Sequence, residues 1–328
     1  MPMQTYTTND GVVLAYHDTG VGEEAATSRP WLLLIHGFTG TSHVWRKNVS
    51  ALAAHYRLII PDLRGHGASQ KPDHGFQVSR LAMDLRELVL LLQGTQEKGM
   101  EREWRAIGGS LGASILWCYA SLFTTAPFTH TVFIDQSPLQ NALPDWDAGY
   151  CSRGMNNPLA VAALQSTLAT SPADAHKATI AACLAYRAYP LPSDFASAAA
   201  REAQTRDDEA FFLGEAMRGH QAYYGQLMAD HTALDWRSSI AATFGPASGS
   251  QTQVLVVASS RSGCFPAAGP LEVVRLVGEK ARGVVVAWGG HWCYWEDPGR
   301  FDDLVLRFLA GGVEERGGDS GFGSWVRG

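Results

Sequence analysis

Short apolar runs alternate with amphipathic stretches over the first 138 residues of the chain. Residues 31–35, 56–60 and 131–134 are apolar runs of strand length, rich in Leu, Ile and Val. Runs of this length are typical of buried strands. Residues 81–92 instead carry apolar side chains at helical spacing, which predicts an amphipathic helix. Strands that alternate with helices predict a mostly parallel sheet with helices on both faces.

The pattern changes between residue 139 and about residue 235. This stretch is rich in Ala and aromatic residues, and no run in it has the character of a strand. Residues 160–168 and 209–217 have the composition of helices. Five prolines interrupt the stretch, at positions 144, 158, 172, 190 and 192. We therefore predict a helical insertion over residues 139–235.

The sheet pattern returns after the insertion. Residues 254–258 and 284–288 are apolar runs of strand length. The sequence thus predicts a first part of an α/β core over residues 1–138 and a second part over residues 236–310. Residues 311–328 are rich in glycine, which predicts a flexible tail.

Composition and charge exclude several classes of protein. A chain of 328 residues with 46% hydrophobic side chains can bury one large core, or one core and a smaller lobe. The net charge is −6, and the charged residues are scattered along the chain instead of forming a cluster of Lys and Arg. This argues against a nucleic-acid partner. No segment has the apolar length of a membrane span or the pattern of a signal peptide. We therefore predict a soluble cytoplasmic protein, and leave a homodimer open.

Cysteine usage agrees with a reducing compartment. The five cysteines are odd in number and form no Cys-x-x-Cys pair, so neither a disulfide framework nor a zinc site is predicted, and no metal or cofactor is expected. They are Cys118, Cys151, Cys183, Cys264 and Cys293.

The pentapeptide Gly108-Gly109-Ser110-Leu111-Gly112 lies between an apolar run and a helix-like stretch. This pattern is typical of a nucleophile elbow, a tight turn that exposes a serine hydroxyl between a strand and a helix. Small residues two positions before and after the serine avoid a backbone collision. Taken alone, the same residues also fit an ordinary tight turn.

Three further motifs follow predicted strands: His36-Gly37-Phe38-Thr39-Gly40, Asp62-Leu63-Arg64-Gly65-His66-Gly67 and Gly289-Gly290-His291. In this order, together with the Ser110 pentapeptide, they resemble the α/β-hydrolases, in the branch of small esterases, haloperoxidase-like enzymes, epoxide hydrolases and carbon–carbon bond hydrolases. The resemblance implies a mostly parallel eight-stranded sheet with an inserted helical cap over residues 139–235.

The same resemblance implies a division of catalytic roles. Ser110 is the expected nucleophile and His291 the base that takes its proton, since a serine hydroxyl needs such a base at neutral pH. The backbone amides of Phe38 and Leu111 are the expected oxyanion hole. His36 is expected to support its loop by hydrogen bonding. Epoxide hydrolases and dehalogenases of the family need an aspartate where Ser110 stands, which disfavours both reactions.

The third member of the triad departs from the common pattern. The acid usually follows the strand at 254–258, but the chain has Ser262 at that place, and no Asp or Glu occurs between Asp235 and Glu272. We predict that Asp135, after the strand at 131–134, replaces it, because both strands end on one rim of the sheet. Ser262 is then expected to contribute little. The alternatives are that Asp135 is a turn residue before Ser-Pro, and that the triad is degraded. Asp62 is the competing carboxylate, but the resemblance implies that its loop is chiefly a structural turn.

Substrate specificity is expected from the helical insertion. Its large side chains predict an apolar lining with polar tips, although each could instead pack between helices. The candidates for substrate contact are Trp146, Tyr150, Met155, Tyr186 and Tyr223. Trp292, beside His291, is a further candidate for the cavity wall.

These inferences predict a serine hydrolase that cleaves a carboxylic ester or lactone of a small hydrophobic molecule through an acyl-enzyme. Two alternatives use the same triad: a carbon–carbon bond hydrolase and a perhydrolase. An alternative from another class is a hydrolase-fold protein that binds a small ligand with little turnover.

Overall fold

The computed structural model of the protein describes residues 2–23, 28–94, 103–311 and 321–328. Within these residues a single sheet has nine strands in the order β1-β2-β4-β3-β5-β6-β7-β8-β9. Strands β4, β3, β5, β6, β7 and β8 run parallel, whereas β1, β2 and β9 pair antiparallel with their neighbours. The strands are β1 (Met3–Thr7), β2 (Val13–Asp18), β3 (Trp31–Ile35), β4 (Arg57–Pro61), β5 (Trp104–Gly109), β6 (Phe128–Ile134), β7 (Gln253–Ser259), β8 (Ala281–Val286) and β9 (Ser324–Arg327).

Helices cover both faces of the sheet, as the uninterrupted apolar strands predict. Leu33 and Ile35 of β3 point into one hydrophobic cluster, and Leu32 and Leu34 point into the other. The first cluster includes helices α3 (Val78–Gly94), α4 (Leu111–Phe123), α10 (Arg237–Phe244) and α11 (Ala268–Val277). The second includes α2 (Val49–Ala53), α12 (Cys293–Glu296) and α13 (Pro298–Leu309). The predicted α/β fold class is confirmed.

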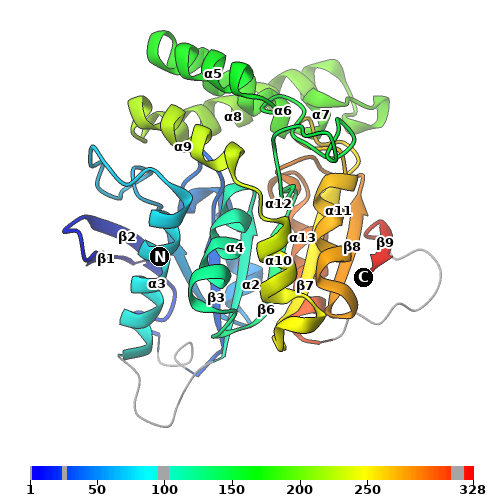
Figure 1. Ribbon diagram of the computed structural model, residues 1–328. Helices are drawn as coiled ribbons and strands as arrows, with labels where there is room; N and C mark the ends of the chain where they lie inside the picture. The colour runs from blue at the N-terminus through cyan, green and yellow to red at the C-terminus, as the bar shows by residue number, and fades with distance from the viewer. Residues whose placement is uncertain (1, 24–27, 95–102, 312–320) are drawn as a thin grey trace.

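The helices of residues 158–233 lie over one end of the sheet (Figure 1). They are α5 (Pro158–Thr170), α6 (Pro172–Cys183), α7 (Ala185–Ala188), α8 (Ala198–Met217) and α9 (Gln221–Ala233). Two of the prolines that interrupt this stretch begin helices, because Pro158 and Pro172 occupy first-turn positions where no backbone hydrogen bond is lost. We refer to residues 158–233 as the helical layer.

The end of the chain differs from the predicted flexible tail. Strand β9 pairs antiparallel with β8, from Arg282 opposite Arg327 to Val285 opposite Ser324. The sheet therefore has nine strands, one more than the eight predicted, and β9 is the additional strand. The glycine-based prediction was wrong here because the Ser-Trp-Val-Arg segment adds a hydrogen-bonded strand to the open edge of β8, and its Trp325 and Val326 pack against the two clusters. The rest of the predicted tail, residues 312–320, lies outside the described residues.

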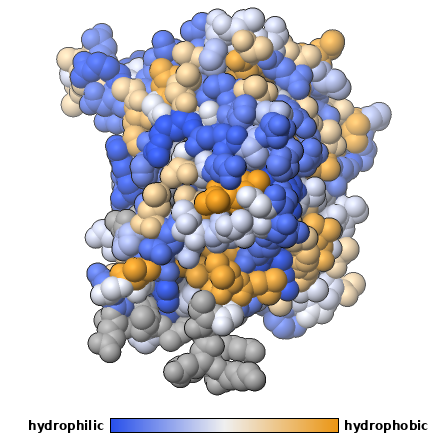
Figure 2. Space-filling view, turned by 90° about the vertical axis from the view of Figure 1, so that its left-hand side faces the viewer, coloured by the Kyte–Doolittle hydropathy of each residue, from blue (hydrophilic) through white to orange (hydrophobic). Residues whose placement is uncertain are grey.

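The surface on the β1 and β2 side is largely hydrophilic, and its hydrophobic residues form separate patches (Figure 2). Among the described helices, none is both long and apolar enough to cross a membrane.

Candidate active site

Ser110 occupies the sharp turn between β5 and α4. Its φ of 52° and ψ of −120° lie outside the regions that side chains favour, a conformation that costs about 1–3 kcal/mol. The Ser110 amide donates to the carbonyl of Ile134 at 2.9 Å, which ties the turn to β6. A Cβ at Gly108 would lie 2.5 Å from the backbone of Gly112, and one at Gly112 would lie 2.5 Å from the carbonyl of Ile35. The two glycines are therefore required by the close packing of the turn.

Asp135 and His291 meet at the rim of the sheet. Asp135 follows β6 and His291 follows β8, and the two are 156 residues apart in the chain. His291 Nδ1 lies 2.7 Å from Asp135 Oδ2, and both side chains are buried. Parallel strands bring their carboxyl ends to one edge, which explains how such distant residues come together. The arrangement is the one expected of an acid that orients a catalytic histidine.

Ser262 lies on the other side of the same carboxylate. Its hydroxyl donates to Asp135 Oδ2 at 2.5 Å, and the Ser259 amide donates to Asp135 Oδ1 at 3.2 Å. The sequence did not predict this contact: at the place where an acid was expected, Ser262 is a hydrogen-bond donor to the Asp135 carboxylate. Together these contacts fix the position of the Asp135 carboxylate beside His291.

The environment of His291 shifts its titration. Burial lowers the pKa of His291, but the neighbouring Cys264 and the Asp135 carboxylate raise it, and the net shift is upward. Because Nδ1 faces Asp135, Nε2 is the nitrogen left to exchange a proton with another group.

Ser110 and His291 border the same cavity but are not hydrogen-bonded to each other in the structure. The Ser110 hydroxyl instead donates to Gln136 Oε1 at 3.4 Å, a long hydrogen bond. The sequence did not point to Gln136. Catalytic hydrogen bonds are often long or absent before substrate binds.

The two backbone amides predicted to form an oxyanion hole belong to Leu111, which follows Ser110 directly, and to Phe38, in the loop after β3. Among the described residues, neither the Phe38 amide nor the Leu111 amide has a hydrogen-bond acceptor. A Cβ at Gly37 would lie 3.1 Å from Ser110 Cβ, so the loop before Phe38 packs directly on the turn. His36 supports that loop, since its Nε2 accepts from the Leu63 amide at 3.0 Å and its Nδ1 donates to the Gly37 carbonyl at 2.8 Å.

A cavity of about 520 Å³ lies between this rim and the helical layer. Alanines of α5 and α6 supply much of its wall, and Ser110, His291 and Phe38 lie at its base. Its polar lining residues include Gln140, Ser152, Thr179 and His231. Two larger hollows, of about 880 and 750 Å³, are lined by surface residues and contain none of the predicted catalytic groups.

Of the five predicted substrate contacts, only Met155 is among the residues that line this cavity. Trp146 donates to the Leu139 carbonyl at 2.8 Å, and its ring lies 4.9 Å from that of Tyr150. The other two are occupied elsewhere: the Tyr186 hydroxyl donates to Asp208 at 3.0 Å, and Tyr223 stacks on Phe76 at 4.7 Å. The prediction was wrong for these four because each ring found a packing partner within the fold. Trp292 lines the cavity as predicted.

Sequence reasoning missed His231. This residue of α9 is 3% exposed, borders the cavity, and has no hydrogen-bond partner for Nδ1 among the described residues. Burial, and second to it the positive charge of His291 in its protonated form, lower the pKa of His231 to about 3, so the His231 ring is neutral at physiological pH. No motif surrounds His231 in the sequence, and only the packing of α9 over the rim brings it to the site.

Comparisons with known proteins agree with this architecture. A family model described as "alpha/beta hydrolase fold" matches residues 30–298. A soluble epoxide hydrolase from Corynebacterium sp. (strain C12) is 31% identical over 147 residues, which are 38% of this chain and 48% of that protein. The match thus spans about half the length of that relative.

Solved structures share the fold at low sequence identity. A bromoperoxidase from Bacillus anthracis superposes with a TM-score of 0.77 at 16% identity, over 94% of this chain and 100% of that one. An esterase from Exiguobacterium antarcticum superposes with a TM-score of 0.75 at 15% identity, over 94% and 99% of the two chains.

Proposed function

The chain belongs to the alpha/beta hydrolase fold family, and we propose that it is a serine hydrolase that cleaves a carboxylic ester or lactone of a small hydrophobic molecule through an acyl-enzyme. The observation that carries the proposal is the 2.7 Å hydrogen bond between His291 and Asp135, beside a serine in a nucleophile turn. Orienting a histidine in this way is what a triad requires.

In this mechanism the Ser110 hydroxyl leaves Gln136 and donates to His291 Nε2. As Ser110 Oγ attacks the substrate carbonyl, its proton passes to Nε2, and Asp135 stabilises the resulting imidazolium. The tetrahedral intermediate collapses when His291 returns the proton to the leaving alcohol. A water molecule, activated by the same nitrogen, then hydrolyses the acyl-enzyme.

The amides of Phe38 and Leu111 stabilise the oxyanion. Each is free of another acceptor among the described residues. Leu111 follows Ser110 directly, and the loop before Phe38 packs on the turn. An oxyanion-hole donor of this kind contributes about 3 kcal/mol to lowering the barrier. Because the donors are backbone groups, substitutions that only change the Phe38 side chain are expected to affect binding more than chemistry.

The cavity supports a small, largely apolar substrate. Its wall is built from alanines, Leu164, Met155 and Met228, and its volume of about 520 Å³ suits a small molecule. Neutral His231 also lines the cavity, and its Nδ1 has no hydrogen-bond partner among the described residues. An ester or lactone combines such an apolar body with one polar group.

A second candidate is a ligand-binding protein with little turnover. The observation that favours it is the hydrogen bond of Ser110 to Gln136 instead of His291. In a binding protein of this kind, Ser110 would keep that partner and would not become nucleophilic.

Labelling with a fluorophosphonate probe separates the two candidates. We expect prompt modification of Ser110, identified by peptide mapping, and loss of labelling in Ser110→Ala and His291→Ala. Ser114→Ala is the matched control, because Ser114 lies one turn along α4 and its buried hydroxyl has no hydrogen-bond partner among the described residues. A folded wild-type protein that resists the probe would favour the binding protein.

A further inference from the structure

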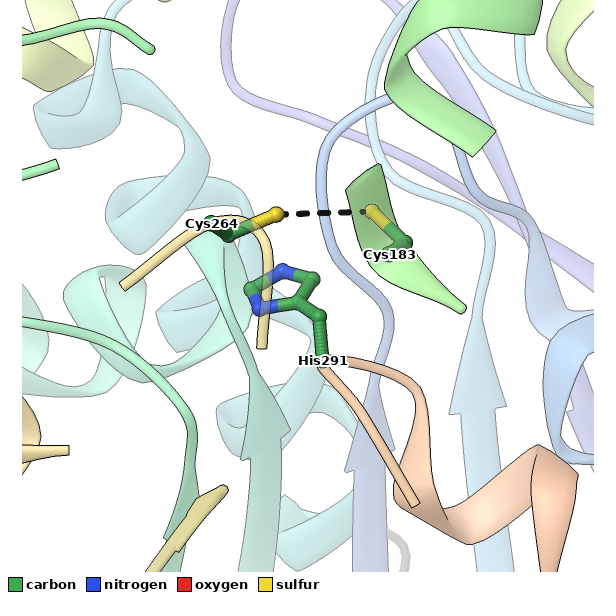
Figure 3. A group of neighbouring side chains, drawn as sticks. All are labelled: Cys183, Cys264 and His291. Atoms are coloured by element: carbon green, nitrogen blue, oxygen red, sulfur yellow. Dashed lines mark hydrogen bonds between the residues drawn. The ribbon is translucent and has the colours of Figure 1, made fainter. Parts of the chain in front are cut away.

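Two thiols and an imidazole converge at the base of the cavity. Cys183 is the last residue of α6, Cys264 lies in the loop after β7, and His291 lies in the loop after β8. The Cys183 and Cys264 sulfur atoms are 3.6 Å apart, and neither cysteine is in a disulfide. One ligand atom from each of the three residues lies within 4.8 Å of the others. Figure 3 shows the ring of His291 beside both sulfur atoms.

The distance between the two sulfur atoms fits a shared metal ion. A Zn–S bond is about 2.3 Å, so two thiolates on one tetrahedral zinc ion lie about 3.8 Å apart. The observed 3.6 Å is within a few tenths of an ångström of that distance. Thiolates and imidazoles are also the donor types that zinc prefers. Hard ions such as magnesium prefer oxygen donors instead.

The third donor is already oriented for such a role. Asp135 accepts the hydrogen bond of His291 Nδ1, so Nε2 is the nitrogen available to a ligand. A carboxylate behind a histidine is the usual outer partner of a metal-binding imidazole, since it fixes the ring and increases its basicity. The same His291–Asp135 pair that would act in the triad could therefore also hold a metal ion.

A fourth coordination position of a tetrahedral ion bound by these three residues would face the cavity. Cys183, Cys264 and His291 all line that cavity, in which Cys183 and His291 are buried and Cys264 is half-buried. A site with three protein donors leaves one coordination position for water or another small ligand.

We propose that Cys183, Cys264 and His291 bind a zinc-like divalent ion, and that binding switches off Ser110 chemistry. Two thiol protons leave to solvent as the ion binds, and no electron transfer is involved. The inhibition rests on the proposed function, because His291 Nε2 cannot accept the Ser110 proton while it is bound to the ion. The ion would also join α6 of the helical layer to the rim of the sheet.

Cobalt is the probe for the site, since thiolate-bound Co²⁺ absorbs light and Zn²⁺ does not. The full chain, reduced with a phosphine and freed of metal with a chelator, is titrated with Co²⁺ without oxygen. We expect thiolate-to-cobalt charge-transfer absorption and the visible bands of four-coordinate cobalt, saturating at a single equivalent and abolished by added Zn²⁺. Binding should also raise the thermal unfolding midpoint.

Variants assign the signal to the cluster. Cys183→Ser and Cys264→Ser should each weaken Co²⁺ binding by about 10-fold or more and reduce the charge-transfer absorption. Cys118→Ala is the matched control, because Cys118 is buried in α4 and does not line the cavity. It should bind Co²⁺ like the wild type. No charge-transfer absorption in the reduced wild type would overturn the site, as would unchanged absorption in both folded serine variants.

A labelling experiment measures inhibition of Ser110 separately from metal binding. Zn²⁺ at saturation should slow fluorophosphonate labelling of wild-type Ser110 by at least about 10-fold, and a chelator should restore it. Cobalt absorption with unchanged labelling would overturn the inhibitory role while the binding site stands. If the metal-free wild type is not labelled at all, the proposed hydrolase function fails, and the cobalt titration still decides the metal site.

Discussion

Ser262 donates a hydrogen bond of 2.5 Å to Asp135, the carboxylate that contacts His291. The two residues follow neighbouring strands, β7 and β6. The position at which the sequence led us to expect an acid thus holds a neutral donor, and the proposed acid, Asp135, follows the neighbouring strand. The two side chains meet because parallel strands end at one rim.

Replacing Asp135 tests the relocated acid directly. Asp135→Asn keeps the shape of the side chain but removes the charge that stabilises the imidazolium. We expect kcat for ester hydrolysis to fall by about 10²–10⁴-fold, with KM little changed. Steady-state kinetics on a chromogenic ester measure this. Activity equal to that of the parent would remove Asp135 from the mechanism.

Replacing Ser262 tests the support of that acid. Ser262→Ala removes one donor from a buried carboxylate, and hydrogen bonds to charged groups contribute about 1.5–3 kcal/mol. Because only part of that loss falls on catalysis, we expect kcat/KM to fall by roughly 10-fold. Ser260→Ala is a suitable control, since the Ser260 hydroxyl contacts the Val286 carbonyl instead. Equal kinetics for both variants would contradict the role assigned to Ser262.

Gly108 is expected to be intolerant of a methyl group. A Cβ there would meet backbone atoms of Gly112 and Ala113 at 2.5 and 2.6 Å, which cannot move without opening the turn. We expect Gly108→Ala to lower the free energy of unfolding by about 3 kcal/mol, measured by urea denaturation. Gly214→Ala in α8 is the opposite control, because nothing lies within 4 Å and alanine favours a helix. Its stability should rise by roughly 0.5–1 kcal/mol.

Glu215 links stability to pH. It accepts hydrogen bonds from Thr41 at 2.5 Å and His43 at 3.2 Å and forms an ion pair with Arg218, so α8 is tied to the loop after β3. Burial raises the pKa of Glu215, but the contacts with His43 and Thr41 outweigh it and bring the pKa to about 2, below the usual 4.5. The folded state therefore gains stability from the charged form above pH 4.5, and loses that gain as the pH falls toward 2.

Glu215→Gln should remove this dependence. We expect the variant to be less stable than the wild type at pH 5 by on the order of 1–3 kcal/mol. The difference should shrink as the pH falls from 4.5 to 2, in unfolding curves recorded across that range. A difference that stays constant with pH would show that the Glu215 charge does not contribute.

Local patterns in the sequence were enough to predict the α/β class, the alternation of strands and helices and the turn at Ser110. Each depends on neighbours in the chain: apolar run length, helical spacing, and glycines two residues either side of Ser110. Strand β9 was missed because its pairing depends on the free edge of β8, and the glycines before it carry no information about that edge.

The residue pattern also led to the prediction of Asp135 as the acid, because Ser262 left the expected position without a carboxylate, and the structure places Asp135 against His291. Only the tertiary structure decided the rest of the site. Whether a large side chain faces a cavity or packs on another ring depends on how the helices pack. The sequence alone therefore could not show that Met155 lines the cavity and that Trp146 and Tyr223 do not. Cys183 and His231 are distant from His291 in the chain, and they approach it only because the helical layer packs on the rim of the sheet. Cys264 comes instead from the loop after β7.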